Sequence, residues 1–330
     1  MLATQPRFAA AAQAATCACS SQRSLVSPRS ISMATFWVDL LNQPLPISIP
    51  FHLGFMLRDM VSNRVVPAPD DRRAFMVVAG NTEQSWVDPA NPLRLEFEYV
   101  QRIAEILDLT VLSRPAAERV RIVHVGGGGL TLPRYVAARR PHTAQIVLEP
   151  DEELTAEVRA RLPLPRNSGI KIRAHDGRSG VAQLPDAYAD ALILDAFAAA
   201  SVPAELATVE FFTDVRRALR PGGLLIMNLT DQAPFGWSKR CLAALFATQP
   251  QLVASAEVPV WKGRRFGNLV AVAGPDLPET DFSRALARAP FPYRLLAGRE
   301  LVRFIGAATP FTELDAEPSP PPAWSRTWFS

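Results

Sequence analysis

The chain has 330 residues, a net charge of +3, 48% apolar residues and 20% charged residues. This composition is typical of a globular protein and excludes a largely disordered one. Its apolar runs are shorter than the roughly 18 residues that a membrane span requires. Its arginines are scattered among acids and form no basic stripe. We therefore expect a protein without a membrane span and without a nucleic-acid partner.

The N-terminal segment, residues 1–38, contains no Asp or Glu and is rich in Ala, Ser and Arg. This composition is typical of a disordered extension, including one produced by a start assigned upstream of Met33, and also of organelle transit peptides. The expected location is therefore cytoplasmic, with organelle targeting as the alternative. Cys17 and Cys19 lie in this segment and Cys241 stands alone, so we expect neither a disulfide framework nor a zinc site.

Residues 39–92 are expected to form a small N-terminal β element. Short apolar runs between residues 50 and 90 are broken by Asn, Pro and Asp, and Gly80 and Asn81 favour a turn between two strands.

Residues 93–312 have the pattern of an α/β domain with a mostly parallel, doubly wound sheet. A helix comes first, predicted by apolar residues at four-residue spacing: Leu95, Tyr99, Ile103 and Leu107. Six apolar runs then read as strands: VRIVHV, AQIVLE, GIKIRAH, DALILDA, GGLLIMNL and NLVAVAG. Segments with helical periodicity alternate with these strands and begin near Leu130, Glu152, Ala204 and Trp237. The last segment, residues 313–330, is Pro-rich and is expected to be an extended tail.

The most informative stretch, residues 121–151, combines a predicted strand, four glycines, a helix, a second strand and Glu149. Glycines lack the Cβ atoms that keep a ligand from the backbone, and they tolerate positive φ. Glu149 follows by about twenty residues, where a carboxylate can accept hydrogen bonds from a ribose diol. Thr131 replaces the third glycine of a dinucleotide motif, which weakens an NAD interpretation. A plain structural turn and a solvated acid remain the alternatives to a nucleoside site at Gly126, Gly127, Gly128 and Glu149.

Two further acids, Asp176 and Asp195, stand near predicted strand ends. The carboxyl ends of parallel strands share one edge of the sheet, so we expect both acids near the glycine loop. Asp176 also fits an ordinary turn, and its functional interpretation is recognition near an adenine ring. Asp195 is either a hydrogen-bonded or helix-capping residue, or a base or anchor for an amine. His124 and Cys241 are expected to be core residues.

These motifs form an ordered series along the chain: GNTEQS, EFEYVQ, GGGGLTLPRY, LEPD, HDGRSG, DAFAAASVPAEL, VEFF and VPVWKGRRFGN. The series resembles the spermidine synthase family of aminopropyltransferases, in a divergent bacterial spermidine synthase-like branch, over about residues 75–310. The resemblance implies a small N-terminal β domain and a class I methyltransferase-like Rossmann domain. It also implies aminopropyl transfer from decarboxylated S-adenosylmethionine, or a related adenosyl sulfonium donor, to a small-molecule amine, with no metal and in a homodimer.

The resemblance also implies roles for individual residues. Asp195 would be the catalytic base, and Tyr99 and Trp261 would contact the amine acceptor. The nucleoside of the donor would be held by Gln84, Gly126, Gly127, Gly128, Glu149, Asp176 and Gly177.

Several positions depart from the family pattern. Gly129 stands where the family's glycine loop carries an aspartate, and Ala198 replaces the second aspartate of the catalytic strand end. The family's Tyr-His-Glu is Tyr99, Val100 and Gln101 here. Two alternatives therefore stay open. One is an S-adenosylmethionine-dependent methyltransferase, since Gly129 removes a carboxylate that would repel the carboxyl group of that donor; the other is a non-catalytic nucleoside-binding homologue.

Overall fold

The computed structural model describes residues 63–79 and 82–322, which all lie in one compact unit, Met56–Ser330. The predictions for residues 1–38, for Cys17 and Cys19, and for the turn at Gly80 and Asn81 lie outside the described residues. The predicted domain boundaries stay predictions.

A small antiparallel sheet comes first, with strands in the order β1 (Asn63–Pro67), β2 (Phe75–Ala79) and β3 (Thr82–Val87). Because side chains along a strand alternate between the two faces of the sheet, apolar residues of the three strands gather on one face. Val65, Val77 and Val87 on this face pack against Leu130 and Leu154 of the following domain. The expected small N-terminal β element is confirmed, and its apolar face is what joins it to the larger sheet.

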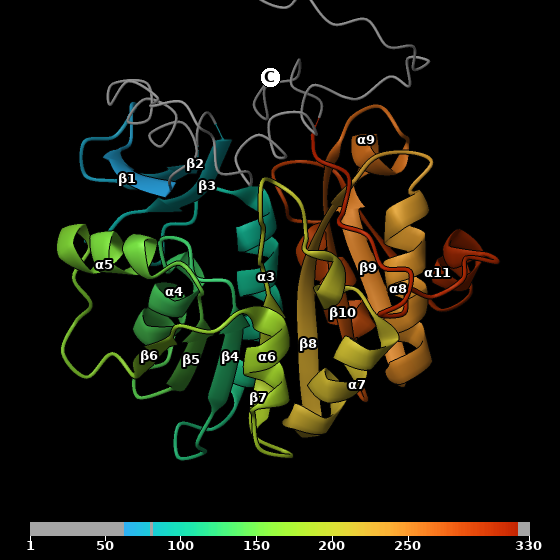
Figure 1. The fold of residues 1–330 in the computed structure, drawn as a ribbon, viewed down its shortest axis with the longest axis horizontal. Helices are drawn as coiled ribbons and strands as arrows, with labels where there is room; N and C mark the ends of the chain where they lie inside the picture. Colours follow the sequence, from blue (N-terminus) through green and yellow to red (C-terminus); the bar gives the residue numbers. More distant parts are fainter. Residues whose placement is uncertain (1–62, 80–81, 323–330) are drawn as a thin grey trace, which may run out of the picture. The chain divides into compact units, whose positions relative to one another are not determined.

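The main sheet has eight strands in the order β11-β9-β10-β8-β7-β4-β5-β6 (Figure 1). The strands are β4 (Arg121–Val125), β5 (Ala144–Leu148), β6 (Ile170–Arg173), β7 (Ala189–Leu194), β8 (Leu219–Asp231), β9 (Gln251–Glu257), β10 (Gly267–Gly274) and β11 (Tyr293–Ala297). Neighbours from β6 to β8 pair in parallel, whereas β10, β9 and β11 extend the sheet with antiparallel pairs. The mostly parallel, doubly wound α/β fold is confirmed.

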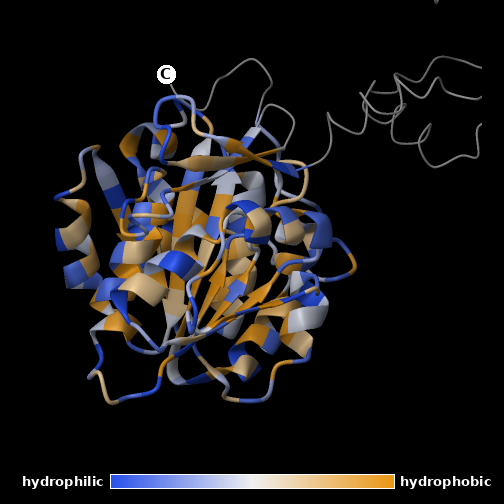
Figure 2. Ribbon diagram, turned by 90° about the vertical axis from the view of Figure 1, so that its left-hand side faces the viewer, coloured by the Kyte–Doolittle hydropathy of each residue, from blue (hydrophilic) through white to orange (hydrophobic). Residues whose placement is uncertain are grey.

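Helices cover both faces of this sheet, so its apolar strands lie inside the molecule (Figure 2). One face packs against α6 (Gly177–Ala182), α7 (Val209–Ala218), α8 (Gly236–Thr248) and α11 (Gly298–Ile305). The other face packs against α3 (Glu98–Leu109), α4 (Thr131–Arg139) and α10 (Glu279–Leu286), and α5 (Glu152–Arg161) packs beside Val147 of β5. Three short helices complete the described elements: η1 (Val111–Ser113), η2 (Ala204–Leu206) and α9 (Val258–Trp261).

Successive side chains of a strand point to opposite faces of the sheet, so they pack into two different apolar clusters, one on each face. Val123 and Val125 face the cluster with the fully buried Phe211 and Phe212, whereas Ile122 faces α3. Burial of each large apolar side chain contributes about 1.5–3 kcal/mol. This two-sided burial explains why the parallel strands read as continuous apolar runs.

His124 and Cys241 lie in the core, as expected. His124 is 2% exposed and its Nε2 lies 2.9 Å from Gln145 Oε1. Burial lowers the pKa of His124 from 6.5 to about 4, so the ring is neutral at physiological pH. Cys241 Sγ lies 4.0 Å from Met227 Sδ, and burial raises the pKa of this thiol.

Candidate functional site

A large cavity opens at the edge of the main sheet where the parallel strands end. Its volume is about 890 Å³, which is in the range of small-molecule sites. The ends of β4, β5, β7 and β8 contribute lining residues, as do β3, the start of α3 and the adjoining ends of β9, β10 and β11. Ligands of open α/β sheets bind at this edge, so the cavity is the candidate site.

The glycine loop between β4 and α4 holds Glu149 against its backbone. The N–H groups of Gly127 and Gly128 donate to Glu149 Oε2 at 2.8 and 3.3 Å, and Asp151 N–H donates to Oε1 at 3.0 Å. Asp151 in turn caps α5 by accepting from Leu154 N–H. A carboxylate offers roughly four lone-pair positions, so Glu149 retains capacity for a further donor such as a ribose hydroxyl.

Gly126 allows the ends of β4 and β7 to meet. Its φ is +94°, and a Cβ atom there would lie 2.3 Å from the carbonyl oxygen of Asp195. Gly126 N–H donates to Leu148 O and Asp195 N–H donates to Val125 O, both at 2.9 Å. The ends of β4, β5 and β7 can therefore lie this close together because position 126 carries no side chain.

The small sheet covers the second half of the glycine loop. Gly129 N–H donates to Ser85 Oγ at 3.1 Å, and Thr131 Oγ1 donates to Trp86 O at 3.0 Å. A Cβ atom on Gly129 would lie 2.9 Å from Val87 Cγ2 and 3.2 Å from Ser85 Cβ. Strand β3 therefore occupies the space that an acidic side chain at position 129 would need. Thr131, at the place of a third glycine, ties α4 to β3.

Asp195 follows β7 directly and faces two hydrogen-bond donors. Asn228 Nδ2 donates to Oδ1 at 2.9 Å, and the Tyr99 hydroxyl lies 3.5 Å from Oδ2. Burial raises the pKa of Asp195 from 3.8 to about 6, and both donors oppose this shift. The carboxyl is thus both oriented and able to exchange a proton near neutral pH.

Asp176 and Gly177 begin α6 at the rim of the cavity. Asp176 caps this helix by accepting from Ser179 N–H at 2.8 Å, and the Ser179 hydroxyl donates to it at 2.6 Å. These bonds, the hydroxyl first, lower the pKa of Asp176. A Cβ atom on Gly177 would lie 2.4 Å from Val125 Cγ1. Both residues line the cavity and also have a local structural role.

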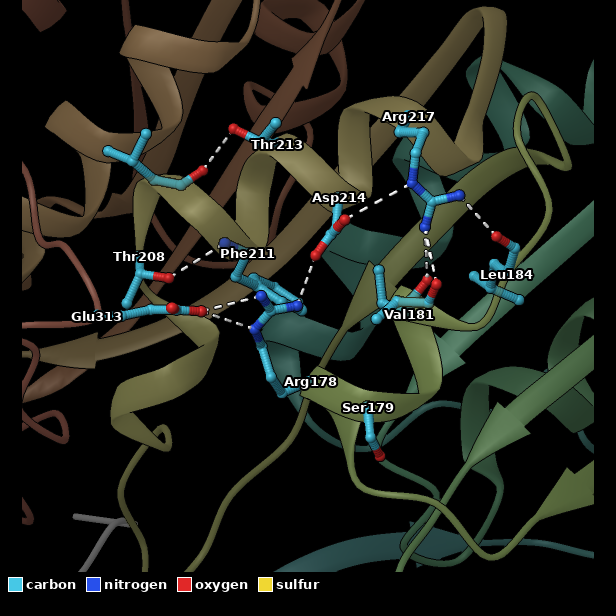
Figure 3. A network of polar contacts seen from close by, with 12 residues as sticks. Arg178, Ser179, Val181, Leu184, Thr208, Phe211, Thr213, Asp214, Arg217 and Glu313 are labelled. Atoms are coloured by element: carbon cyan, nitrogen blue, oxygen red, sulfur yellow. Dashed lines mark hydrogen bonds and ion pairs between the residues drawn. The ribbon is translucent and has the colours of Figure 1, made fainter.

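Arg178 fixes the helix that Asp176 caps (Figure 3). Its guanidinium pairs with Asp214 of α7 at 2.6 Å and with Glu313 of the C-terminal segment at 2.9 Å. Asp214 also lies 3.6 Å from Arg217 Nε, and Arg217 donates to Leu184 O at 2.7 Å. This network joins α6, α7 and the C-terminal segment beside the cavity.

C-terminal residues also hold the segment that follows Asp195. Ser319 is 1% exposed, its Oγ accepts from Val202 N–H at 2.8 Å and its N–H donates to Val202 O at 3.0 Å. Between Asp195 and Val202, Ala199 and Ala200 adopt positive φ angles of 48° and 63°. The Pro-rich segment has no helix or strand in its described part, residues 313–322, but it is anchored to the domain through Ser319.

Four polar residues at the far end of the cavity were not identified from the sequence. Glu98 comes from the first turn of α3, Glu257 ends β9, Arg265 precedes β10 and Tyr293 begins β11. Arg265 pairs with Glu257. The Tyr293 side chain lies near Glu98, and burial raises the pKa of both groups. Glu98 stands inside the quoted motif EFEYVQ and Arg265 inside VPVWKGRRFGN, whereas Glu257 and Tyr293 carry no local signal.

The cavity is rich in acids. Its described lining contains one arginine, Arg265, and these seven carboxylates: Glu83, Glu98, Glu149, Asp176, Asp195, Glu205 and Glu257. His124 also lines it but is neutral. A concave surface with one excess sign of charge concentrates ligands of the opposite sign.

The structure brings together most of the residues singled out in the sequence. The cavity is lined by Gln84, Tyr99, Gly126, Gly127, Gly128, Glu149, Asp176, Gly177 and Asp195. Trp261 is not among the lining residues: it packs against Phe235 and Phe304, and its Nε1 donates to Arg294 O at 3.0 Å. The aromatic hydroxyl that faces the cavity from this side is that of Tyr293.

Two further observations concern the described residues alone. No group of three or more His, Cys, Asp and Glu side chains is arranged to hold a metal ion within residues 63–79 and 82–322. No helix in the same ranges combines the length and apolar character needed to cross a bilayer.

No protein-family model matches the sequence. A probable polyamine aminopropyl transferase of Bifidobacterium longum (strain NCC 2705) is 30% identical over 124 residues, covering 36% of this chain and 27% of that protein. A polyamine aminopropyltransferase of Halorhodospira halophila (strain DSM 244 / SL1) is 32% identical over 135 residues, covering 38% of this chain and 48% of that protein. The chain thus matches less than half the length of these curated relatives.

A solved structure gives a longer match. The crystal structure of a probable spermidine synthase from Corynebacterium glutamicum ATCC 13032 superimposes with a TM-score of 0.70 at 28% identity, covering 76% of this chain and 92% of that chain.

The fold and the cavity together define an α/β protein of the Rossmann, methyltransferase-like class, with its site at the carboxyl edge of the parallel strands. Within this class, the chain is similar in sequence to polyamine aminopropyltransferases and in structure to a probable spermidine synthase.

Proposed function

We propose that the protein transfers an aminopropyl group from decarboxylated S-adenosylmethionine, or a related adenosyl sulfonium donor, to an amine. The observation that carries this proposal is the partly buried Asp195 carboxyl, oriented by Asn228 and facing a cavity with seven carboxylates and one arginine. Donor and acceptor are both cationic, and excess negative charge favours their binding. The names of the related proteins support the same class of reaction.

The residues at one end of the cavity fit the nucleoside of such a donor. Gly126 and Gly128 keep the loop backbone open through positive φ angles. Glu149 would accept the ribose hydroxyls, and Gln84 and Asp176 lie around the same end of the cavity lining. Binding of a nucleoside would explain why a glycine loop and an acid, Glu149, occur together at the ends of two neighbouring strands.

In the proposed reaction the acceptor nitrogen attacks the aminopropyl carbon next to the sulfonium sulfur. The new N–C bond forms as the C–S bond breaks, and the electron pair of that bond stays on sulfur, which leaves as the neutral thioether methylthioadenosine. The amine proton passes to Asp195. Asn228 holds one oxygen of this carboxylate, so the other faces the acceptor with Tyr99 beside it. Orientation and proton acceptance are thus the contributions of the protein.

The direct test incubates purified protein with decarboxylated S-adenosylmethionine and a series of amines that begins with putrescine. We expect release of methylthioadenosine together with an aminopropylated amine, and release that is slower by about 10²–10⁴-fold from the Asp195→Asn variant. Absence of both products with every amine in the series would refute aminopropyl transfer.

A second candidate is methyl transfer from S-adenosylmethionine. Gly129 favours it, because the loop lacks the acid that would repel the carboxyl group of that donor. Calorimetric titration with S-adenosylmethionine and with its decarboxylated form separates the two candidates. We expect tighter binding of the decarboxylated form because the lining is acid-rich; a preference for the intact donor would favour methyl transfer. Binding of both donors without any product would support the non-catalytic alternative.

The homodimer and the cytoplasmic location implied earlier stay predictions. Size-exclusion chromatography with light scattering checks the first, and localisation of the tagged full chain checks the second.

A further inference from the structure

Two phenylalanines line the cavity beyond the polar residues of the sheet edge. Phe197 comes two residues after Asp195, past the end of β7. Phe291 comes two residues before Tyr293, the first residue of β11. Strand β9 runs in the same direction as β7 and β11 runs against it, so β11 begins at the edge where β7 ends. Both phenylalanines therefore stand outside the edge that holds Asp195 and Tyr293.

Solvent exposure identifies this outer part as the mouth of the cavity. Phe291 is 53% exposed, and it alone among the large exposed apolar side chains of the described residues lines the cavity. Ala198 is also exposed and lines the cavity, at a position where the family pattern that the sequence resembles has an aspartate. Phe97, which stacks on Tyr99 with ring centroids 6.1 Å apart, is a further lining residue. The mouth, defined as Phe97, Phe197, Ala198 and Phe291, is thus apolar.

The wall of the mouth beside Phe197 has a fixed shape. Ala198 and Ser201 exchange two backbone hydrogen bonds, of 2.8 and 3.0 Å, which close a hairpin. Between them, Ala199 and Ala200 have positive φ angles of 48° and 63°, and Ala200 also lines the cavity. Residues other than glycine keep such angles only where the surrounding structure holds them. The wall is therefore formed before a ligand binds, and little ordering opposes binding against it.

The acids of the cavity belong to elements outside the mouth. Asp195 follows β7, Glu257 ends β9 and Glu98 lies in the first turn of α3. Glu205 lies on η2, which contacts α6 near the glycine loop end of the cavity. A ligand whose nitrogen reaches Asp195 therefore extends outward past uncharged side chains. There an apolar group gains stability from burial, whereas an ammonium group loses hydration and finds no carboxylate among the mouth residues. Aromatic faces attract a cation only weakly at exposed sites.

We propose that the amine acceptor carries an apolar alkyl or aryl group, which packs between Phe197 and Phe291 while its nitrogen reaches Asp195. The proposal rests on the proposed function for the identity of the reacting atom. It adds the class of acceptor, an amine with a nitrogen at its inner end and an apolar group at its outer end. Burial of that group stabilises the complex in proportion to the apolar area removed from water.

The test compares two amines of equal length that differ at the outer end. Hexylamine ends in a methyl group, whereas 1,6-diaminohexane ends in an ammonium group. Each amine is titrated by calorimetry into the full chain saturated with methylthioadenosine, which requires no turnover. The wild type is expected to bind hexylamine at least about fivefold more tightly than diaminohexane, because the mouth accepts a methyl group without loss of hydration.

Variants at position 291 assign this preference to the mouth. Phe291→Ala removes the ring and should weaken hexylamine binding about fivefold while leaving diaminohexane binding unchanged. Phe291→Leu keeps an apolar side chain and should retain most of the affinity. The matched control is Phe246→Ala, which removes a phenylalanine that is 49% exposed on α8 and lies outside the cavity lining, and it should bind both amines like the wild type. Thermal unfolding checks that each variant is folded.

The proposal is overturned if diaminohexane binds as tightly as hexylamine or more tightly, if neither amine binds, or if Phe291→Ala and Phe246→Ala have the same effect. Failure of the proposed function has a separate signature, the absence of methylthioadenosine release with every amine. An active protein that does not prefer hexylamine refutes this inference alone. An inactive protein whose hexylamine affinity depends on Phe291 refutes the reaction and retains the apolar mouth.

Discussion

The two ends of the cavity are built in different ways. At one end, the glycine loop and Glu149 come from one continuous stretch, residues 121–151, in which β4, α4 and β5 follow one another. At the far end, Glu98, Glu257 and Tyr293 come from three separate elements, α3, β9 and β11. The first end is a local motif, and the second exists only after the antiparallel strands have assembled.

Two positions lack the acids expected from the family pattern that the sequence resembles. At position 129 the small sheet fills the space for an acid, and at position 198 the chain carries alanine. The cavity lining nevertheless contains seven carboxylates, among them Asp195 and, at the far end, Glu98 and Glu257. Negative charge is thus present in the cavity, but it is held by different elements. The following changes test each end separately.

The largest effect is expected from Asp195→Asn. An amide cannot accept the amine proton, so the turnover should fall roughly 10²–10⁴-fold while nucleoside binding persists. Methylthioadenosine release and calorimetry with methylthioadenosine measure the two quantities. Asp281→Asn, an exposed acid on α10, is the matched control. Wild-type turnover in Asp195→Asn would assign proton acceptance to another group.

Introducing, at positions 129 and 198, the acid that the resembled family pattern implies should have different outcomes at the two positions. Gly129→Asp forces a side chain against Val87 and Ser85, so the free energy of unfolding should fall by about 1–3 kcal/mol. Ala198→Asp adds a carboxylate at an exposed cavity position and should change stability by less than about 0.5 kcal/mol while tightening amine binding. Urea unfolding and amine titration check both. A stable, more active Gly129→Asp variant would mean that β3 can move aside.

The rate should depend on pH through Asp195. The base acts in its ionised form, and its pKa is about 6, so kcat/KM for the amine should fall about tenfold for each pH unit below 6. The free energy of unfolding should change with pH in the opposite direction to the rate. Because the folded-state pKa is raised, the folded protein binds the proton more tightly, and the contribution of this group is lost as pH rises from 3.8 through about 6. Urea unfolding of wild type and Asp195→Asn from pH 4 to 7 should therefore show a smaller loss in the variant.

A loss of stability without a direct effect on the cavity is expected from Ser319→Ala, which removes the acceptor of Val202 N–H. A buried donor left without a partner costs about 1–3 kcal/mol, measured as the change in the free energy of unfolding. Ser283→Ala, at an exposed position of α10, is the control and should be neutral. Equal stability of both variants would show that the C-terminal segment does not support the segment after Asp195.

The parallel half of the fold could be predicted because its central strands β4, β5, β7 and β8 are largely buried on both faces and read as apolar runs. Strands β9 and β11 were missed. Their sequences, QLVASAE and YRLLA, carry small or charged residues and become strands through pairing with β10 and with each other. The position of Trp261 could not be predicted from the sequence either, because its packing against Phe304 depends on where α11 docks.

The sequence by itself determined the fold class, the glycine loop with Glu149, and the acids that end β6 and β7, because strand, turn and helix are adjacent in the chain and their spacing sets their geometry. Only the tertiary structure decided that β3 closes the loop at Gly129 and that Glu98, Glu257 and Tyr293 share one end of the cavity. These contacts join segments far apart in sequence. Their geometry follows from strand order and helix docking, which leave no local pattern in the residues themselves.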